Sequence, residues 1–217
     1  MIMWETLGYP WQAALEMAWE AYCSRTIPIG AVIADAEGNI YARGRNRIMD
    51  TTAPDNQVCA NELAHAELNA LLALKLDYDE CKAKNVALYT TMEPCPLCMG
   101  AVYMSDVKTL HYAAHDPWAG STNLLGTTPY LSRKNFKVIA PFDPVLEDCL
   151  SALCVESEIQ RRGESILSSR FYDLLRKTLP NAVEKGIVLY HSGELRKKQK
   201  AELPANQVFD WLAHQVQ

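Results

Sequence analysis

Two cysteines at the junction of a β-prone run and a helix constrain this chain more than any other feature. The stretch LYTTMEPCPLCMGAV, residues 88–102, places Cys95 and Cys98 three positions apart, directly after a proline. Such a pair can form a disulfide, a thioredoxin-like redox centre, a metal site or ordinary buried packing. The chain has seven cysteines, an odd number, and its N-terminal residues lack the pattern of a signal peptide. We therefore expect a cytoplasmic protein, where a disulfide is disfavoured.

The pattern of apolar residues predicts alternating strands and helices. Helical spacing covers residues 10–23, 62–76, 95–105 and most of 145–217. β-prone runs cover residues 27–35, 40–47, 85–92, 107–114 and 136–141, and the turn AEGN joins the first two as a hairpin. Strands separated by helices predict an α/β fold, a layered domain with a sheet covered on both faces. We place one boundary near Gly163, between a domain of residues 1–162 and a C-terminal helical extension of residues 163–217.

A histidine and a glutamate stand thirty positions before the cysteines, in the sequence His65-Ala66-Glu67. One imidazole and two thiolates are the ligands of a zinc site whose fourth position stays open, which is the mark of a catalytic site. A glutamate beside such a site is placed to move protons rather than to bind the metal. Because residues i and i+2 do not share a helix face, His65 and Glu67 converge only if the site lies at a helix end. A thioredoxin-like pair is disfavoured, since the C-x-x-C lies far from the N-terminus and has better-explained companions.

The pattern H-x-E followed by P-C-x-x-C is the signature of zinc deaminases that act on nucleobases. The chain resembles the cytidine deaminase superfamily, and more closely its branch of tRNA adenosine deaminases and guanine deaminases. The resemblance runs from about Trp11 to Ala140, through IPIGAVI, GRNR, HAELNAL and LYTTMEPCPLCMGAV. It implies a three-layer αβα fold with a mixed five-stranded sheet, and a homodimer. It also implies that His65, Cys95 and Cys98 bind Zn²⁺ and that Glu67 is the general acid/base.

Five further residues are candidates for binding the substrate. By the resemblance, Asn46 in the GRN motif hydrogen-bonds the substrate base, and Ala66 offers its backbone N–H. His115, Asp116 and Trp118 lie at the end of a predicted strand and in the loop that follows it, which spans residues 115–131. We expect substrate contacts there, because binding residues concentrate on loops that a rigid scaffold positions.

The remaining reactive or aromatic residues are better explained by packing. Cys59 precedes His65 by six positions, and we expect it to be buried rather than bound to the metal. Glu93 is expected to act through its backbone, if at all. The other cysteines are predicted to pack in the core: Cys23, Cys81, Cys149 and Cys154. His111 is predicted to be a core or surface histidine on a strand, and Trp4, Trp11 and Trp19 are predicted to lie in the core or at an interface.

Charge separates three functional hypotheses. Residues 1–157 contain 11 Lys and Arg against 19 Asp and Glu, a net charge of −8, and residues 158–217 have a net charge of +3. The acidic bulk disfavours a nucleic-acid partner, and we expect the basic tail to be a solvated helix surface. We therefore favour a deaminase of a purine-type base, nucleoside or related small amino-heterocycle, with no membrane partner. The alternatives are a tRNA adenosine deaminase and a non-catalytic protein that keeps zinc for structure. After about residue 120 the chain has no counterpart that we recognise in the tRNA enzymes.

Overall fold

The structure is a computed structural model that describes residues 4–140 and 143–217. Its sheet contains β1 (Gly30–Ala34), β2 (Ile40–Arg45), β3 (Ala87–Thr90), β4 (Thr109–Tyr112) and β5 (Lys137–Ile139). The strand order is β2-β1-β3-β4-β5. The pairs β1–β2 and β1–β3 are antiparallel, whereas β3–β4 and β4–β5 are parallel. The predicted mixed five-stranded sheet is therefore confirmed. Pro141, the last residue of the predicted fifth strand, lies outside the described residues.

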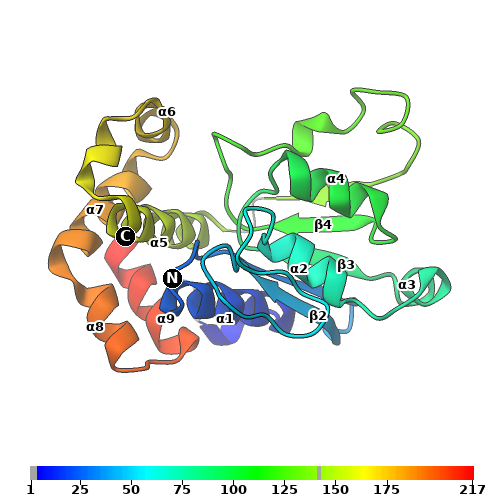
Figure 1. Ribbon diagram of the computed structural model, residues 1–217, viewed down its shortest axis with the longest axis horizontal. Coiled ribbons are helices and arrows are strands. Elements are labelled where there is room, and N and C mark those ends of the chain that lie inside the picture. Colours follow the sequence, from blue (N-terminus) through cyan, green and yellow to red (C-terminus); the bar gives the residue numbers. More distant parts are fainter. Residues whose placement is uncertain (1–3, 141–142) are drawn as a thin grey trace.

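Helices cover both faces of this sheet (Figure 1). They are η1 (Trp4–Thr6), α1 (Tyr9–Cys23), α2 (Ala66–Ala73), α3 (Tyr78–Lys84), α4 (Pro96–Met104), η2 (Thr122–Leu124), α5 (Pro144–Arg162), η3 (Glu164–Ser168), α6 (Arg170–Thr178), α7 (Pro180–Ser192), α8 (Glu194–Lys200) and α9 (Ala205–Val216). Alternating residues of β1 point to opposite faces of the sheet. Val32 packs with Ala13 and Ala14 of α1, and Ala31 and Ile33 join the core under α2 and α4. The predicted three-layer αβα class is confirmed.

One helix is shorter than predicted, and one helix was not predicted. The helix predicted over residues 62–76 begins only at Ala66, because residues 61–63 form a turn and His65 has an extended backbone. The short helix α3 was not predicted. Its sequence signal is the capping box of Asp77 and Glu80, in which each side chain accepts a hydrogen bond from the other residue's backbone N–H.

The C-terminal helices share a hydrophobic core with α1. Buried residues of α7, α8 and α9 join a cluster that contains Trp11, Trp19 and residues of α5. The Trp19 indole Nε1 donates to the Leu203 carbonyl at 2.8 Å, and the Gln199 amide donates to the Cys23 carbonyl at 2.8 Å. The tryptophans of the N-terminal segment thus pack in the core, as predicted. Residues 163–217 lie against α1 and α5 rather than apart from them (Figure 1).

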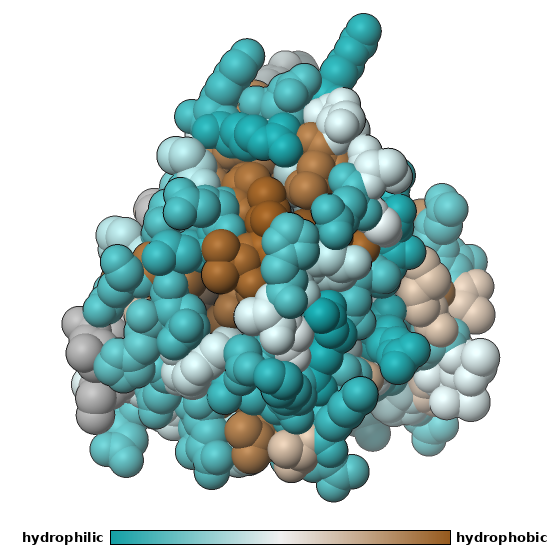
Figure 2. Space-filling model, turned by 90° about the vertical axis from the view of Figure 1, so that its left-hand side faces the viewer, coloured by the Kyte–Doolittle hydropathy of each residue, from teal (hydrophilic) through white to brown (hydrophobic). Residues whose placement is uncertain are grey.

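The surface on the side of the C-terminal helices is mostly hydrophilic, with an apolar area near its centre (Figure 2). In these helices Val188 of α7 is an exposed apolar side chain, with 55% of its surface accessible. No helix within residues 4–140 and 143–217 combines the length and the apolar character that a membrane span requires.

Candidate active site

His65, Cys95 and Cys98 come together although thirty positions separate the histidine from the first cysteine. The His65 Nδ1 atom lies 3.4 Å from the Cys95 sulfur and 3.4 Å from the Cys98 sulfur. All three ligand atoms lie within 4.8 Å of one another. Neither cysteine is in a disulfide, and nor is any other cysteine of the described chain.

This triangle has the size that a zinc ion requires. Tetrahedral bonds of about 2.05 Å to nitrogen and about 2.3 Å to sulfur would separate the two ligand atoms by about 3.6 Å. In the structure, the distance from His65 Nδ1 to each cysteine sulfur is 3.4 Å, close to this value. The donor set is one imidazole nitrogen and two sulfurs, which zinc prefers, and it supplies three of four tetrahedral positions. We conclude that these residues fit a zinc ion with one open position.

The ends of two helices bring the three ligands together. His65 is the residue immediately before α2, and Cys95 is the residue immediately before α4. Pro96 occupies the first turn of α4, where its missing N–H costs no hydrogen bond. Free N–H groups and the helix dipole at this end favour a thiolate. The pKa of Cys95 is lowered to about 4, first by the hydrogen bond with Cys98, while the same bond and burial raise the pKa of Cys98.

Glu67 lies beside the three ligands without belonging to them. It is in the first turn of α2, and only 4% of its surface is accessible. Burial raises the pKa of this carboxyl, and the nearby Cys95 raises it further. The position of His65 outside the helix explains how residues 65 and 67 can face one centre. The expectation that the site lies at a helix end is met.

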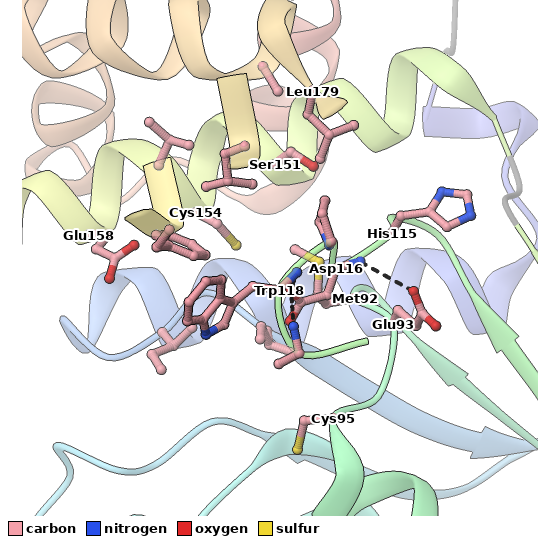
Figure 3. A pocket seen from close by; sticks show the side chains of 18 of the residues that line it. Met92, Glu93, Cys95, His115, Asp116, Trp118, Ser151, Cys154, Glu158 and Leu179 are labelled. Atoms are coloured by element: carbon pink, nitrogen blue, oxygen red, sulfur yellow. Dashed lines mark hydrogen bonds between the residues drawn. The ribbon is translucent and has the colours of Figure 1, made fainter. Parts of the chain in front are cut away.

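A cavity of about 260 Å³ opens next to the metal ligands. His65, Glu67 and Cys95 form one part of its wall. The five residues predicted to bind substrate also line it: Asn46, Ala66, His115, Asp116 and Trp118. Figure 3 shows Cys95 on one side of this space, with Asp116, Trp118 and Met92 between it and the side chains of α5.

Asn46 is held so that its amide nitrogen stays available. It follows the last residue of β2 and is 2% accessible. Its Oδ1 atom accepts hydrogen bonds from the Thr26 hydroxyl at 2.5 Å and from the Ile48 N–H at 3.1 Å. Both contacts fix the side chain through its oxygen, which leaves the Nδ2 group as the donor for a ligand. Ala66 is the first residue of α2, so its N–H has no acceptor within the helix.

Glu93 shapes the loop that follows β4. Its carboxylate accepts from the Thr122 hydroxyl at 2.5 Å and from the Thr122 and Asp116 N–H groups at 3.2 and 3.4 Å. The side chain thus has a role, whereas the sequence suggested only a backbone role. Asp116 in turn accepts through Oδ1 from the N–H groups of Trp118 and Ala119, both at 2.9 Å. Burial raises the pKa of Asp116.

His115 and Trp118 occupy different parts of this loop. The His115 ring is 2.7 Å from a Glu147 oxygen of α5, and it points away from Cys95 (Figure 3). Trp118 is 59% exposed and packs edge-to-face on Phe171 of α6, with ring centroids 5.7 Å apart. Trp118 and Phe171 therefore border the cavity together.

The cavity wall opposite the metal ligands was not predicted. It consists of residues from α5, α6, α7 and the junction between the last two helices: Ser151, Cys154, Val155, Glu158, Arg161, Phe171, Leu175, Leu179, Ala182 and Val183. Cys154, which we expected only to pack in the core, lines this wall, and burial raises the pKa of its thiol to about 12. Cys59 does not join the metal ligands, as predicted, but it is half-buried rather than buried.

Comparison with known proteins defines the class. Residues 5–114 match the family model of the cytidine and deoxycytidylate deaminase zinc-binding region. The chain belongs to this family, and the cluster of His65, Cys95 and Cys98 lies within the matched residues.

The similar proteins include enzymes of both kinds named above. The tRNA-specific adenosine deaminase of Bacillus subtilis is 32% identical over 142 residues, 63% of this chain and 79% of that protein. The solved structure of guanine deaminase from Nitrosomonas europaea is 26% identical, with a TM-score of 0.52 over 66% of this chain and 80% of the other. The tRNA(Ile)-lysidine synthase of Deinococcus deserti is 35% identical over 108 residues, and this match spans 50% of this chain but only 19% of the synthase.

Proposed function

We propose that this chain is a zinc-dependent hydrolytic deaminase of a small amino-heterocycle, a purine-type base, a nucleoside or a related compound. It would replace the amino group with oxygen and release ammonia. One observation supports the small substrate above all others: helices α5, α6 and α7 form the cavity wall opposite the metal ligands. A cavity of about 260 Å³ walled in this way suits a free ring compound rather than a macromolecule.

The residues of the site divide the chemistry among them. Zinc, when bound, would lower the pKa of a water in its open position to about 7. Glu67 would accept a proton from the attacking water and donate it to the ring nitrogen next to the amino-bearing carbon. It would then carry the second proton, from the hydroxyl added to that carbon, to the amino group, which leaves as ammonia as the carbonyl forms. The Asn46 amide and the Ala66 N–H would orient the ring. The second oxygen of Asp116 would accept a hydrogen bond from a ring N–H or an exocyclic amine.

A tRNA adenosine deaminase is the second candidate, favoured by the similarity to the Bacillus subtilis enzyme. Such an enzyme needs a basic surface along the nucleic acid next to a pocket for an extruded base. The basic run of this chain lies on α8, which contributes no residue to the cavity among those described. In Figure 1, α8 lies on the left and α4 on the right. Arg196 and Lys197 of α8 face Glu156 and Glu194. These contacts support the small substrate.

A non-catalytic zinc protein is the third candidate. A structural site closes all four tetrahedral positions with protein ligands, whereas this cluster offers three and adjoins a cavity. Glu67 is buried beside it, and a structural zinc site has no use for a carboxylate that is not a ligand. We therefore rank this hypothesis last.

The organisation of the chain is part of the proposal. We propose that residues 1–162 form the deaminase domain and that residues 163–217 are an extension that completes the cavity. Exposed apolar side chains of α2 and α4, namely Leu72, Leu97 and Met104, support a homodimer, which sedimentation velocity would test. The cytoplasmic location stays a prediction.

Substitution of the proposed acid/base tests the function directly. The Glu67→Gln variant should keep its zinc and its melting temperature but lose about 10²-fold or more in turnover. The matched control is Glu62→Gln, an exposed glutamate in the turn before α2. Both variants and the native protein are loaded with zinc and screened for ammonia release on purines, pyrimidines, pterins, triazines and transcribed tRNA. Near-native rates in Glu67→Gln would refute the assigned role, and release from tRNA alone would reverse the order of the first two candidates.

A further inference from the structure

The cavity face of α5 carries polar atoms that have no partner. Three buried side-chain polar atoms in the described residues lack a hydrogen bond, and two of them, Ser151 Oγ and Arg161 Nε, belong to residues that line the cavity. A buried donor without a partner is costly, and more so when it is charged. Two such atoms on one cavity wall indicate that a ligand completes them.

Arg161 differs from every other arginine of comparable burial. Five arginines of the described chain are not fully exposed. Four of them form ion pairs, Arg43 with Glu16, Arg45 and Arg47 with Asp50, and Arg196 with Glu156. Arg161 forms no ion pair with any described residue. Its neighbour Glu158, which also lines the cavity, pairs instead with Arg162 at 3.2 Å.

The cavity extends from the metal ligands to Arg161. Ser151, Cys154, Glu158 and Arg161 are spaced as residues of one helix face, and Figure 3 shows the first three side by side on α5, facing Asp116 and Trp118. Ser151 and Arg161 are about 15 Å apart along the helix axis at 1.5 Å per residue. Arg161 lines the same cavity as Asp116 and the metal ligand Cys95. This space is longer than a purine ring system.

We propose that the substrate is an amino-heterocycle with an anionic substituent, a carboxylate or a phosphate, and that Arg161 binds this group. The proposal rests on the proposed deaminase function and deepens it. The amino-bearing ring would lie at Asn46 and Glu67, and the substituent would run along α5 past Ser151 and Cys154. The Ser151 hydroxyl would hydrogen-bond the ring or its link to the anion.

An anion explains Arg161 better than a neutral group does. A guanidinium presents several donors in a planar fork that matches the oxygens of a carboxylate or a phosphate. A single neutral acceptor would leave its charge unpaired beside the apolar side chains Val155, Phe171 and Leu175 of the same wall. The chain has a net charge of −5, so acidic residues that could pair with a buried cation outnumber the basic ones. An unpaired guanidinium in the interior is therefore unexpected unless it has a ligand.

Matched pairs of ligands test the proposal. The probes are adenosine and adenosine 5′-monophosphate, guanosine and guanosine 5′-monophosphate, and pterin and pterin-6-carboxylate. Binding is measured by calorimetry in the zinc-loaded Glu67→Gln protein, so that no ligand is consumed, and ammonia release is measured in the native protein. Each measurement is repeated with Arg161→Gln and with the control Arg170→Gln, which removes an exposed arginine at the start of α6.

The native cavity should bind the anionic member of at least one pair about 10- to 100-fold more tightly, as expected for hydrogen bonds to a charged group. Arg161→Gln should abolish this preference and Arg170→Gln should keep it. The pterin pair reports a carboxylate site and the nucleoside pairs a phosphate site. The melting temperature of Arg161→Gln should be unchanged or higher, because the side chain has no partner to lose.

Three outcomes would overturn the proposal: no preference for an anionic member in any pair, a preference that survives Arg161→Gln, or a clear loss of stability in that variant. Ammonia release without a preference for anionic ligands would support the deaminase function and refute the anion site at Arg161. An Arg161-dependent preference in binding without ammonia release would support the anion site and refute the deaminase function.

Discussion

Gly44 sets the distance between the sheet and the helix that carries the proposed acid/base. A Cβ atom added at Gly44 of β2 would lie 2.3 Å from the Ala66 carbonyl oxygen and 2.3 Å from the Ala70 nitrogen, both backbone atoms of α2. Contacts below 3.0 Å are essentially never tolerated, so the helix must move away by at least about 0.7 Å. Ala66 lies between His65 and Glu67, and the displacement therefore falls on the metal ligand and the carboxylate together.

The Gly44→Ala variant should lose both stability and activity. Overpacking of this kind costs about 1–3 kcal/mol, and each kcal/mol lowers the melting temperature by about 2–4 °C in a chain of this size. A misplacement near 1 Å can reduce kcat/KM by about 10²-fold. Melting is measured with a chelator present, so that weaker zinc binding does not add to the apparent loss. Zinc content and ammonia release are then measured on the metal-loaded protein.

Gly100 of α4 provides the control, because a Cβ added there would meet nothing within 4 Å. Gly100→Ala should raise stability by up to about 1 kcal/mol through helix propensity alone and leave zinc binding intact. A Gly44→Ala protein with native melting temperature, zinc content and turnover would show that close packing of β2 on α2 does not position the site.

Three other outcomes follow from particular contacts. Glu93→Gln should raise KM more than it lowers kcat, because Thr122 and the loop of residues 115–131 lose a charged hydrogen-bond acceptor. Equal changes in KM and kcat would contradict this. His111 stacks on Tyr89, and burial lowers the pKa of its imidazole. The unfolded chain therefore binds more protons than the folded chain, and stability should fall as pH drops below about 6.5. His111→Gln should flatten the dependence of melting temperature on pH between about 7.5 and about 5.5. Truncation after Gly163 should give insoluble protein, since it exposes the faces of α1 and α5 that the last helices cover; a soluble, fully active product would argue against their shared core.

The metal site was predictable because its information is local. Each ligand belongs to a short segment with its own structural signal: Pro96 marks the start of α4, and the extended residue His65 precedes the Ala- and Leu-rich helix α2. The sequence also required that His65 lie at a helix end, since otherwise Glu67 would point elsewhere. The start of α2 was the part that local propensity predicted least well, because the turn at residues 61–63 competes with the helix.

The opposite wall was not predictable, because no local signal separates it from a solvent-facing helix surface. Ser151, Glu158 and Arg161 read as polar positions of an amphipathic helix, and Cys154 reads as a small core residue. Only the packing of α6 and α7 over this face turns it into the wall of a cavity. That packing depends on contacts between residues far apart in the chain, such as Trp118 with Phe171.

If the proposed function holds, the C-terminal helices, rather than the metal ligands, would decide which substrate this chain accepts. The family match ends at residue 114, before α5 begins, so the shared deaminase features say nothing about more than half of the residues that line the cavity. An extruded tRNA base brings flanking nucleotides with it and needs an open mouth for them. Here the contact of Trp118 with Phe171 borders the cavity, and Leu175, Leu179 and Val183 line the space beyond it. A free ring with one charged substituent needs only the interior of that space, and the unpaired guanidinium of α5 is the group that would distinguish it from an uncharged base.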